Sequence, residues 1–164
     1  MSKVESWEAL DEALALAFDS DEKVLVESEL VGDEVEVGVI EHPDGRIEAS
    51  VPARLNGTED SAEGFYGFET KYLEDGVTAT IPAPYDDAVI EQLQQLALRC
   101  FRALNCKSLA RIDFFVTAEG PVLNEINTMP GFTPISMYPQ VWQASGLDYP
   151  EMLDLLVTTA LARA

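Results

Sequence analysis

The stretch LARIDFFVTAEGPVLNEINTMPGFTPISM, residues 109 to 137, decides the fold of this chain. Residues 109–116 are rich in Phe, Ile and Val and alternate as a β-strand does, and residues 122–127 form a second run of strand type. Between the two runs, Gly120 permits a positive φ and Pro121 closes a turn. We therefore expect a β-hairpin at this point of the chain.

Alternation along the two predicted strands gathers charged and polar side chains on one face of each strand. Arg111 and Asp113 share a face of the first strand, and Glu125 and Asn127 share a face of the second. Folding the hairpin about Glu119 sets Asp113 opposite Glu125 and Arg111 opposite Asn127. Cross-strand neighbours have Cβ atoms roughly 5 Å apart, so two carboxylates placed there repel each other unless a cation lies between them.

Spacing alone leaves two interpretations of these acids open. Asp113, Glu125 and Asn127 offer only oxygen donors, which are the ligands of a hard cation such as Mg²⁺, with phosphate oxygens completing its shell. Arg111 beside them favours this interpretation, because arginine and Mg²⁺ together bind phosphoryl groups in transfer sites. The alternative is a solvated polar face on an edge hairpin of an acidic chain.

The composition limits the classes of partner. The chain has 164 residues, of which 30 are acidic and 10 basic, and its net charge is −20. Such a charge disfavours nucleic acid and anionic membranes as partners. No apolar run approaches the length of a membrane helix, and the N-terminus lacks the features of a signal peptide, so we expect a cytoplasmic chain. Cys100 and Cys106 form no CxxC site, and we expect buried free thiols.

Hydrophobic periodicity predicts an α+β fold with a mostly antiparallel sheet backed by helices. Strict alternation over 34–41 places Glu34, Glu36 and Gly38 on one face of a strand, and a return strand at 47–54 completes a half-buried hairpin meander. The elements expected elsewhere are helices at 8–18, 86–104, 141–144 and 151–162 and strands at 23–27 and 77–81.

Two segments of the hairpin region carry a family resemblance. ARIDFF at 110–115 and LNEINTMPGFTPISMYP at 123–139 closely resemble the D-alanine–D-alanine ligases, members of the ATP-grasp superfamily. The segment 65–73 looks like the part that covers the nucleotide in this family, and 24–27 with 32–34 resembles its hinge. The resemblance implies an ATP-grasp C-terminal domain at 31–164, preceded at 1–30 by the remainder of the central subdomain and the hinge.

The resemblance also implies an activity and a set of cofactors. Family members join two D-alanines in an ATP-dependent reaction through an acyl phosphate, for peptidoglycan precursor synthesis. The implied cofactors are ATP and two Mg²⁺ or Mn²⁺ ions, held by Asp113, Glu125 and Asn127. Arg111 would stabilise charge on the transferred phosphoryl group, and the backbone N–H of Gly131 would donate to the oxyanion.

Further residues match the binding positions of the family. Nucleotide binding is implied for Glu27, Leu30, Glu34 and Lys71, of which Glu34 would contact the ribose and Lys71 the phosphates. Substrate contacts are implied for Tyr72, Ser136 and Met137. Met137 departs from the leucine common at its position, which a backbone role tolerates. The second substrate remains open between D-alanine, D-lactate and D-serine.

In the family, an N-terminal domain and the first part of the central domain precede the point at which this chain begins. Those parts carry lysines that bind the phosphates, so we expect the isolated chain to be inactive. The resemblance also implies that the full-length enzyme is a homodimer. The alternative is a non-catalytic acidic binding module that keeps half of the fold. A rise in melting temperature that depends on metal and ATP would separate the two hypotheses.

Overall fold

A computed structural model gives the structure of residues 2–57 and 78–163. The chain divides into two compact units, Met1–Leu30 and Val31–Ala164. The assignment of these parts to ATP-grasp subdomains stays a prediction. No helix among the described residues is long and apolar enough to span a membrane.

The first unit contains a short 3-10 helix, η1 (Trp7–Ala9), followed directly by α1 (Leu10–Phe18), which confirms the predicted helix at 8–18. The predicted strand at 23–27 is wrong, because this segment is irregular chain. Its apolar residues have the composition of a strand, but no strand is described within Met1–Leu30 to supply the ladder of backbone hydrogen bonds that a strand needs.

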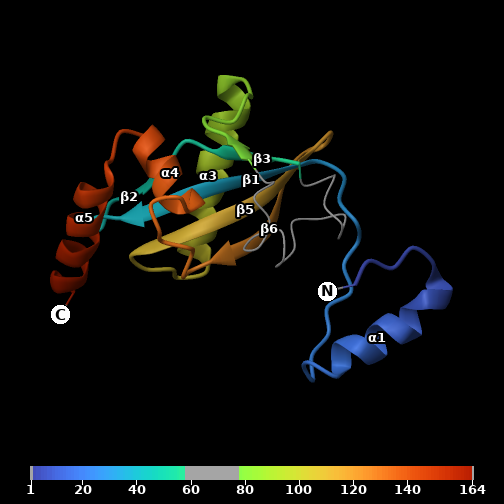
Figure 1. Cartoon of the computed structure of the whole chain (residues 1–164). Coiled ribbons are helices and arrows are strands. Elements are labelled where there is room, and N and C mark those ends of the chain that lie inside the picture. Colours follow the sequence, from blue (N-terminus) through green and yellow to red (C-terminus); the bar gives the residue numbers. More distant parts are fainter. Residues whose placement is uncertain (1, 58–77, 164) are drawn as a thin grey trace. The chain divides into compact units, whose positions relative to one another are not determined.

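The second unit is built on a six-stranded antiparallel sheet with the order β4-β3-β1-β5-β6, in which β2 also pairs with β1 (Figure 1). Its strands are β1 (Asp33–Glu41), β2 (Ile47–Ala49), β3 (Ala53–Asn56), β4 (Thr78–Thr80), β5 (Leu109–Thr117) and β6 (Gly120–Asn127). With the helices on its two faces, this sheet confirms the predicted α+β fold.

Strand β1 lies in the centre of the sheet, which corrects the expectation of a half-buried meander. All residues from Val35 to Glu41 are buried, because β5 pairs along most of the strand and β2 and β3 share its other edge. The predicted single strand at 47–54 is broken at Ser50–Pro52. There the N–H of Val51 donates to Ser145 Oγ at 2.9 Å, outside the sheet, and Pro52 has no N–H to donate.

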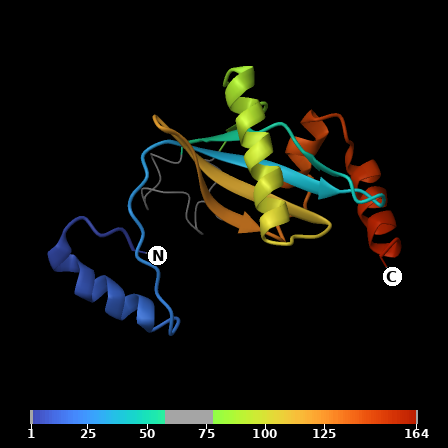
Figure 2. The same cartoon turned by 180° about the vertical axis from the view of Figure 1, so that it is seen from behind.

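One face of the sheet is covered by α3 (Asp87–Ala103), which crosses it in Figure 2. The helix begins where Asp86 accepts a hydrogen bond from the N–H of Val89 at 2.9 Å, an N-cap. Its apolar stripe packs on side chains of β1 and β5; the buried members of this core are Val35, Val37, Val39, Leu93, Ala97, Phe101, Ala110, Ile112 and Phe114. Cys100 and Cys106 are free thiols, as expected, but half-buried.

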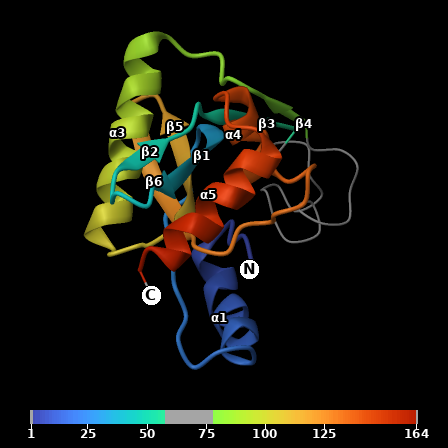
Figure 3. The ribbon, with the colours of Figure 1, turned by 90° about the vertical axis from the view of Figure 1, so that its left-hand side faces the viewer.

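The other face carries α4 (Met137–Ala144) and α5 (Tyr149–Leu161), on the side of the sheet opposite α3 (Figure 3). Helix α4 is longer than the helix predicted at 141–144. Gly38 of β1 allows it to approach, because a Cβ at this position would lie 2.7 Å from Trp142 Nε1. The buried residues of this second core are Ile40, Ala53, Tyr138, Val141, Trp142 and Met152. The apolar residues of α4 and α5 cover this face of the sheet as far as Gly38. Beyond Gly38, the same face carries charged side chains of β1 and β5.

Candidate functional site

The hairpin of β5 and β6 has the predicted register. Asp113 pairs with Glu125 and Arg111 pairs with Asn127. A β-bulge lies between Asp113 and Phe114, and the register changes there: Asp113 pairs with Glu125, but Phe114 pairs with Leu123. The regular alternation expected for 122–127 is therefore interrupted. Bulges bend a strand and redirect its side chains, and they are frequent next to active sites.

Arg111 is the centre of the charged cluster on this face. Its Nε donates to Asp113 Oδ1 at 2.8 Å and its Nη2 donates to Asp113 Oδ2 at 2.7 Å. Bidentate pairs of this kind combine strength with a fixed orientation of the guanidinium plane. Glu125 Oε1 lies 4.0 Å from Nη2. The hairpin therefore brings together Arg111, Asp113 and Glu125, which were predicted to form one site.

A third carboxylate, from Glu36 of β1, belongs to the same cluster and was not predicted. Glu36 pairs with Asp113 across β1 and β5, and its Oε2 lies 3.2 Å from Arg111 Nε. Its side chain is only 3% exposed, whereas that of Glu125 is 49% exposed. The alternation of Glu34, Glu36 and Gly38 was visible in the sequence, but the pairing of their strand with β5 was not.

The surroundings of Arg111 keep its guanidinium charged. Burial lowers its pKa, but the hydrogen bond to Asp113 and the charges of Glu36, Asp113 and Glu125 raise it more, so the net pKa is raised. A buried cation is stable only when it is paired in this way. Three carboxylates therefore surround one guanidinium that stays charged.

The donor set fits a hard cation. Asp113 uses both oxygens for Arg111, but each carboxylate oxygen has a second lone pair. Asn127 Oδ1 accepts a hydrogen bond from the N–H of Met129 at 3.1 Å, which orients its side chain. Over residues 2–57 and 78–163 no group of three or more His, Cys, Asp or Glu side chains has the arrangement of a metal centre. An ion held here would need the amide oxygen of Asn127 and ligands from a nucleotide.

The loop after β6 carries the predicted positions Gly131, Ser136 and Met137. The Oγ of Ser136 accepts a hydrogen bond from the N–H of Thr133 at 3.0 Å, and a Cβ at position 131 would lie 3.0 Å from the same oxygen. Ser136 is the N-cap residue of α4, but its side chain makes no capping hydrogen bond within the described part of the chain. The first N–H groups of α4, starting at Met137, are thus not capped by this hydroxyl.

Aromatic residues hold this loop on the helical layer. The ring of Phe132 lies 5.7 Å from that of Tyr138 and 5.9 Å from that of Tyr149, measured between centroids. The hydroxyl of Tyr149 donates to the Phe132 carbonyl at 2.8 Å. The hydroxyl of Tyr138 donates to the Val39 carbonyl at 2.9 Å, and burial raises the pKa of this phenol. The loop is therefore held on α5 by Tyr149, and it packs through Phe132 on Tyr138 of α4, which is itself bonded to β1.

The remaining predicted positions are distributed over three parts of the chain. Glu34 lies on β1 opposite Phe115 and is half-buried. Glu27 and Leu30 belong to the first unit, where both are exposed. Lys71 and Tyr72 lie outside the described residues. The binding roles of these residues stay predictions.

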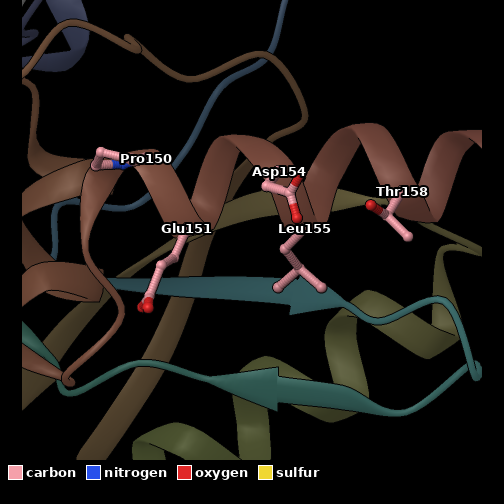
Figure 4. Close-up of a pocket in the computed structure, with 5 residues that line it drawn as sticks. All are labelled: Pro150, Glu151, Asp154, Leu155 and Thr158. Atoms are coloured by element: carbon pink, nitrogen blue, oxygen red, sulfur yellow. The ribbon is translucent and has the colours of Figure 1, made fainter.

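A surface hollow on α5 is unrelated to the charged cluster. Pro150, Glu151, Asp154, Leu155 and Thr158, all from this one helix, line it (Figure 4). Neither the predicted site residues nor Glu36 take part. The two acids that border it are exposed, so nothing in the hollow resembles the buried ion pairing around Arg111.

Comparisons with known proteins agree with this geometry. A family profile described as D-ala D-ala ligase C-terminus matches residues 1–158. The D-alanine–D-alanine ligase of Corynebacterium efficiens is 64% identical over 164 residues, which are all of this chain and 45% of that relative. The chain therefore spans less than half the length of this relative.

Solved structures of ligases superpose on most of the chain. The VanG D-Ala:D-Ser ligase of Enterococcus faecalis has a TM-score of 0.82 and 32% identity, over 96% of this chain and 45% of that chain. The D-alanine–D-alanine ligase of Bacillus anthracis complexed with ATP has a TM-score of 0.77 and 25% identity, over 96% and 48%. These similarities confirm the predicted ATP-grasp C-terminal architecture.

Proposed function

Since the chain belongs to the family of D-alanine–D-alanine ligase C-terminal domains, we propose that it is the C-terminal ATP-grasp portion of an enzyme that joins two D-alanines. The observation that carries the proposal is the buried, bidentate pair of Arg111 and Asp113 with Glu125 across the hairpin. A solvated polar face, the other interpretation of these acids, would not bury an arginine that is only 8% exposed.

Each residue of the cluster takes a role that its environment supports. Asp113, Glu125 and Asn127 would hold Mg²⁺ or Mn²⁺, two ions in total. When bound, these ions would neutralise the β- and γ-phosphates of ATP. Arg111, which stays charged in its buried position, stabilises the negative charge on the transferred phosphoryl group and on the tetrahedral intermediate.

The loop and the start of α4 receive the amino-acid substrates. The backbone N–H of Gly131 donates to the oxyanion that forms when the second amine attacks the acyl phosphate. Ser136, by its hydroxyl, and Met137, by its backbone N–H, bind the carboxylate of the second D-alanine. A helix N-terminus favours such a negative group, and the anchoring of Phe132 by Tyr149 keeps this loop in place.

The nucleotide contacts rest on family membership and on the Bacillus anthracis relative complexed with ATP. Glu27 and Leu30 contact the adenine, Glu34 the ribose and Lys71 the phosphates, while Tyr72 contacts substrate. The enzyme works in the cytoplasm as a homodimer. D-Serine stays a candidate for the second substrate, because one of the similar structures is a D-Ala:D-Ser ligase.

A chimeric ligase tests the proposed function directly. This chain replaces the matching 45% of the Corynebacterium efficiens ligase, and phosphate release from ATP is measured with D-alanine, D-lactate or D-serine as second substrate. We expect release that depends on D-alanine. Glu125→Gln should lower kcat by about 100-fold, because it removes a charged ligand. Glu119→Gln, an exposed change in the turn of the same hairpin, is the matched control and should leave kcat unchanged.

A chimera that folds but releases no phosphate, or a Glu125→Gln variant with full turnover, would contradict the proposal. The 164-residue chain alone should show no ligase turnover. The alternative of a non-catalytic acidic binding module finds no support in the comparisons, and it predicts that Mg²⁺ and ATP leave the melting temperature of the chimera unchanged. We expect the melting temperature to rise.

A further inference from the structure

Glu36 is a buried acid that the roles above leave unused. It is 2% exposed, and its Oε2 lies 3.2 Å from Arg111 Nε. A carboxylate out of contact with water needs a cation beside it, and Arg111 supplies one. Since Nε already donates to Asp113 Oδ1 at 2.8 Å, Glu36 and Asp113 approach the same edge of the guanidinium from two neighbouring strands.

In the proposed function, the carboxylate of Asp113 has two roles. It orients Arg111 through both oxygens, and it is a proposed ligand of the cation. A bound cation draws charge from these oxygens, which weakens the hydrogen bonds that Asp113 accepts from Arg111. Glu125 lies farther away, 4.0 Å from Nη2, and is itself a proposed ligand. Glu36 is thus the one described carboxylate of the cluster that has no proposed ligand role.

We propose that Glu36 is a positioning residue, whose charge keeps the guanidinium of Arg111 in its catalytic orientation while Asp113 and Glu125 serve the cation. This inference rests on the proposed function for the catalytic role of Arg111. The position of Glu36 follows from the sheet, because β1 pairs with β5 so that Glu36 faces Asp113 and Gly38 faces Arg111. Glu36 thus lies on β1, and Arg111 lies on the neighbouring strand β5, two residues from the partner of Glu36. At this position the side chain of Glu36 reaches Arg111 Nε.

The first experiment measures Arg111 in the 164-residue chain itself. Arginine is labelled with ¹⁵N, and the Nε–Hε resonance of Arg111 is identified by its loss in Arg111→Lys. In Glu36→Gln we expect exchange of this proton with water to be faster by about tenfold or more, because the negative charge beside the Nε–H group of Arg111 is lost. Glu41→Gln is the matched control, since Glu41 is also buried on β1 and paired with an arginine. It should leave the Arg111 resonance unchanged.

The second experiment separates charge from shape in the chimeric ligase. Glu36→Gln keeps the shape and loses the charge, whereas Glu36→Asp keeps the charge with a shorter side chain. If Glu36 positions Arg111 by charge, Glu36→Gln lowers kcat by about 10- to 100-fold, which is the range for loss of a residue that orients a group of the site. Glu36→Asp should retain more activity than Glu36→Gln. The KM values for ATP and D-alanine should stay within about threefold, because Glu36 touches neither substrate.

A purely structural role gives the opposite order, with Glu36→Gln more active than Glu36→Asp, and that order would overturn the proposal. Unchanged Hε exchange of Arg111 in Glu36→Gln would also overturn it. If Glu36→Gln does not fold, Glu36→Met takes its place in both experiments. If the unmodified chimera is inactive, the proposed function has failed, and the exchange measurement on the chain still decides whether Glu36 holds Arg111.

Discussion

Strand β1 buries a glutamate beside an arginine at two places, Glu36 near its middle and Glu41 at its end, and the two pairs differ in their surroundings. Glu41 accepts a hydrogen bond from the N–H of Ser108 at 3.0 Å and pairs with Arg163 beyond the end of α5. Its carbonyl accepts from the hydroxyl of Thr159, on α5, at 3.0 Å. The pair of Glu41 and Arg163 connects β1 to the segment after α5. Among the described residues, Glu41 shares neither Arg163 nor the Ser108 N–H with another acid.

Near the middle of β1, Glu36 shares its arginine with Asp113 and Glu125. Three carboxylates thus lie around one guanidinium. A structural contact needs only one acid and one base, because a single pair such as that of Glu41 and Arg163 satisfies both charges. The comparison teaches that burial of an ion pair is common to both places, whereas the gathering of three carboxylates around one guanidinium distinguishes the candidate site from a structural contact.

The largest expected effect comes from replacing Arg111 by lysine, with the same replacement of Arg163 for comparison. In the chimera, Arg111→Lys should lower kcat by about 10²- to 10³-fold, because an ammonium group cannot reproduce the bidentate geometry. Arg163→Lys should leave kcat unchanged. Steady-state kinetics measure both, and equal losses in the two variants would contradict the distinction between the two ion pairs.

A smaller effect is expected at Gly38, which lies between the two pairs. A Cβ there would lie 2.7 Å from Trp142 Nε1, so Gly38→Ala must displace a buried side chain and should cost about 1–3 kcal/mol of the free energy of unfolding. Urea denaturation of the chain measures this loss. The double variant with Trp142→Phe should cost less than the sum of the single variants; strict additivity would show that the clash does not occur.

The Glu41 pair should make stability depend on pH. Burial raises the pKa of Glu41, but hydrogen bonds from Arg163 and the Ser108 N–H, with the charges of Arg163 and Lys107, lower it more, so the net pKa is below 4.5. A depressed carboxyl pKa stabilises the fold above the unfolded pKa, and this contribution is lost as pH falls through the folded pKa.

Between about pH 6 and about pH 3.5, the chain should therefore lose more stability than its Arg163→Met variant does, by on the order of 1 kcal/mol. Thermal unfolding at a series of pH values measures the difference. Parallel curves for the two proteins would show that Arg163 does not hold the pKa of Glu41 down.

The smallest expected effect concerns Tyr149 of α5, and it tests whether this residue also supports the loop after β6 that is proposed to bind substrate. Tyr149→Phe removes the hydrogen bond to the Phe132 carbonyl and should cost about 0.5–1.5 kcal/mol in the free energy of unfolding. In the chimera it should raise the KM for D-alanine, because the loop of Gly131 loses an anchor. A lower melting temperature with unchanged KM would restrict Tyr149 to a structural role.

The sequence was sufficient for the local part of the site. Strand alternation and one turn gave the pairing of Asp113 with Glu125, and the structure has this pairing. The bulge beside Asp113 could not be predicted, because it adds a residue to one strand without changing the composition of either. The oxygen donors and the arginine could be chosen by chemistry alone, and their roles stay predictions.

The parts that depend on distant partners were missed. Residues 23–27 have the composition of a strand, yet the described residues of the first unit include no strand to pair with them. Glu36 was placed on the right face of its strand, but its neighbour Arg111 comes from a segment far along the chain. Periodicity reports which face a residue occupies, and it contains no information on which strand lies alongside.

The pairing of β1 with β5 also sets an order of assembly for the charged cluster. Strands β5 and β6 are joined by a short turn, and such hairpins form in about 1–10 μs. Joining β1 to β5 closes a far longer loop, whose entropy makes the contact slower to form. During folding, Arg111, Asp113 and Glu125 thus meet while still in water, and the arrival of β1 with Glu36 is the step that removes the guanidinium from solvent.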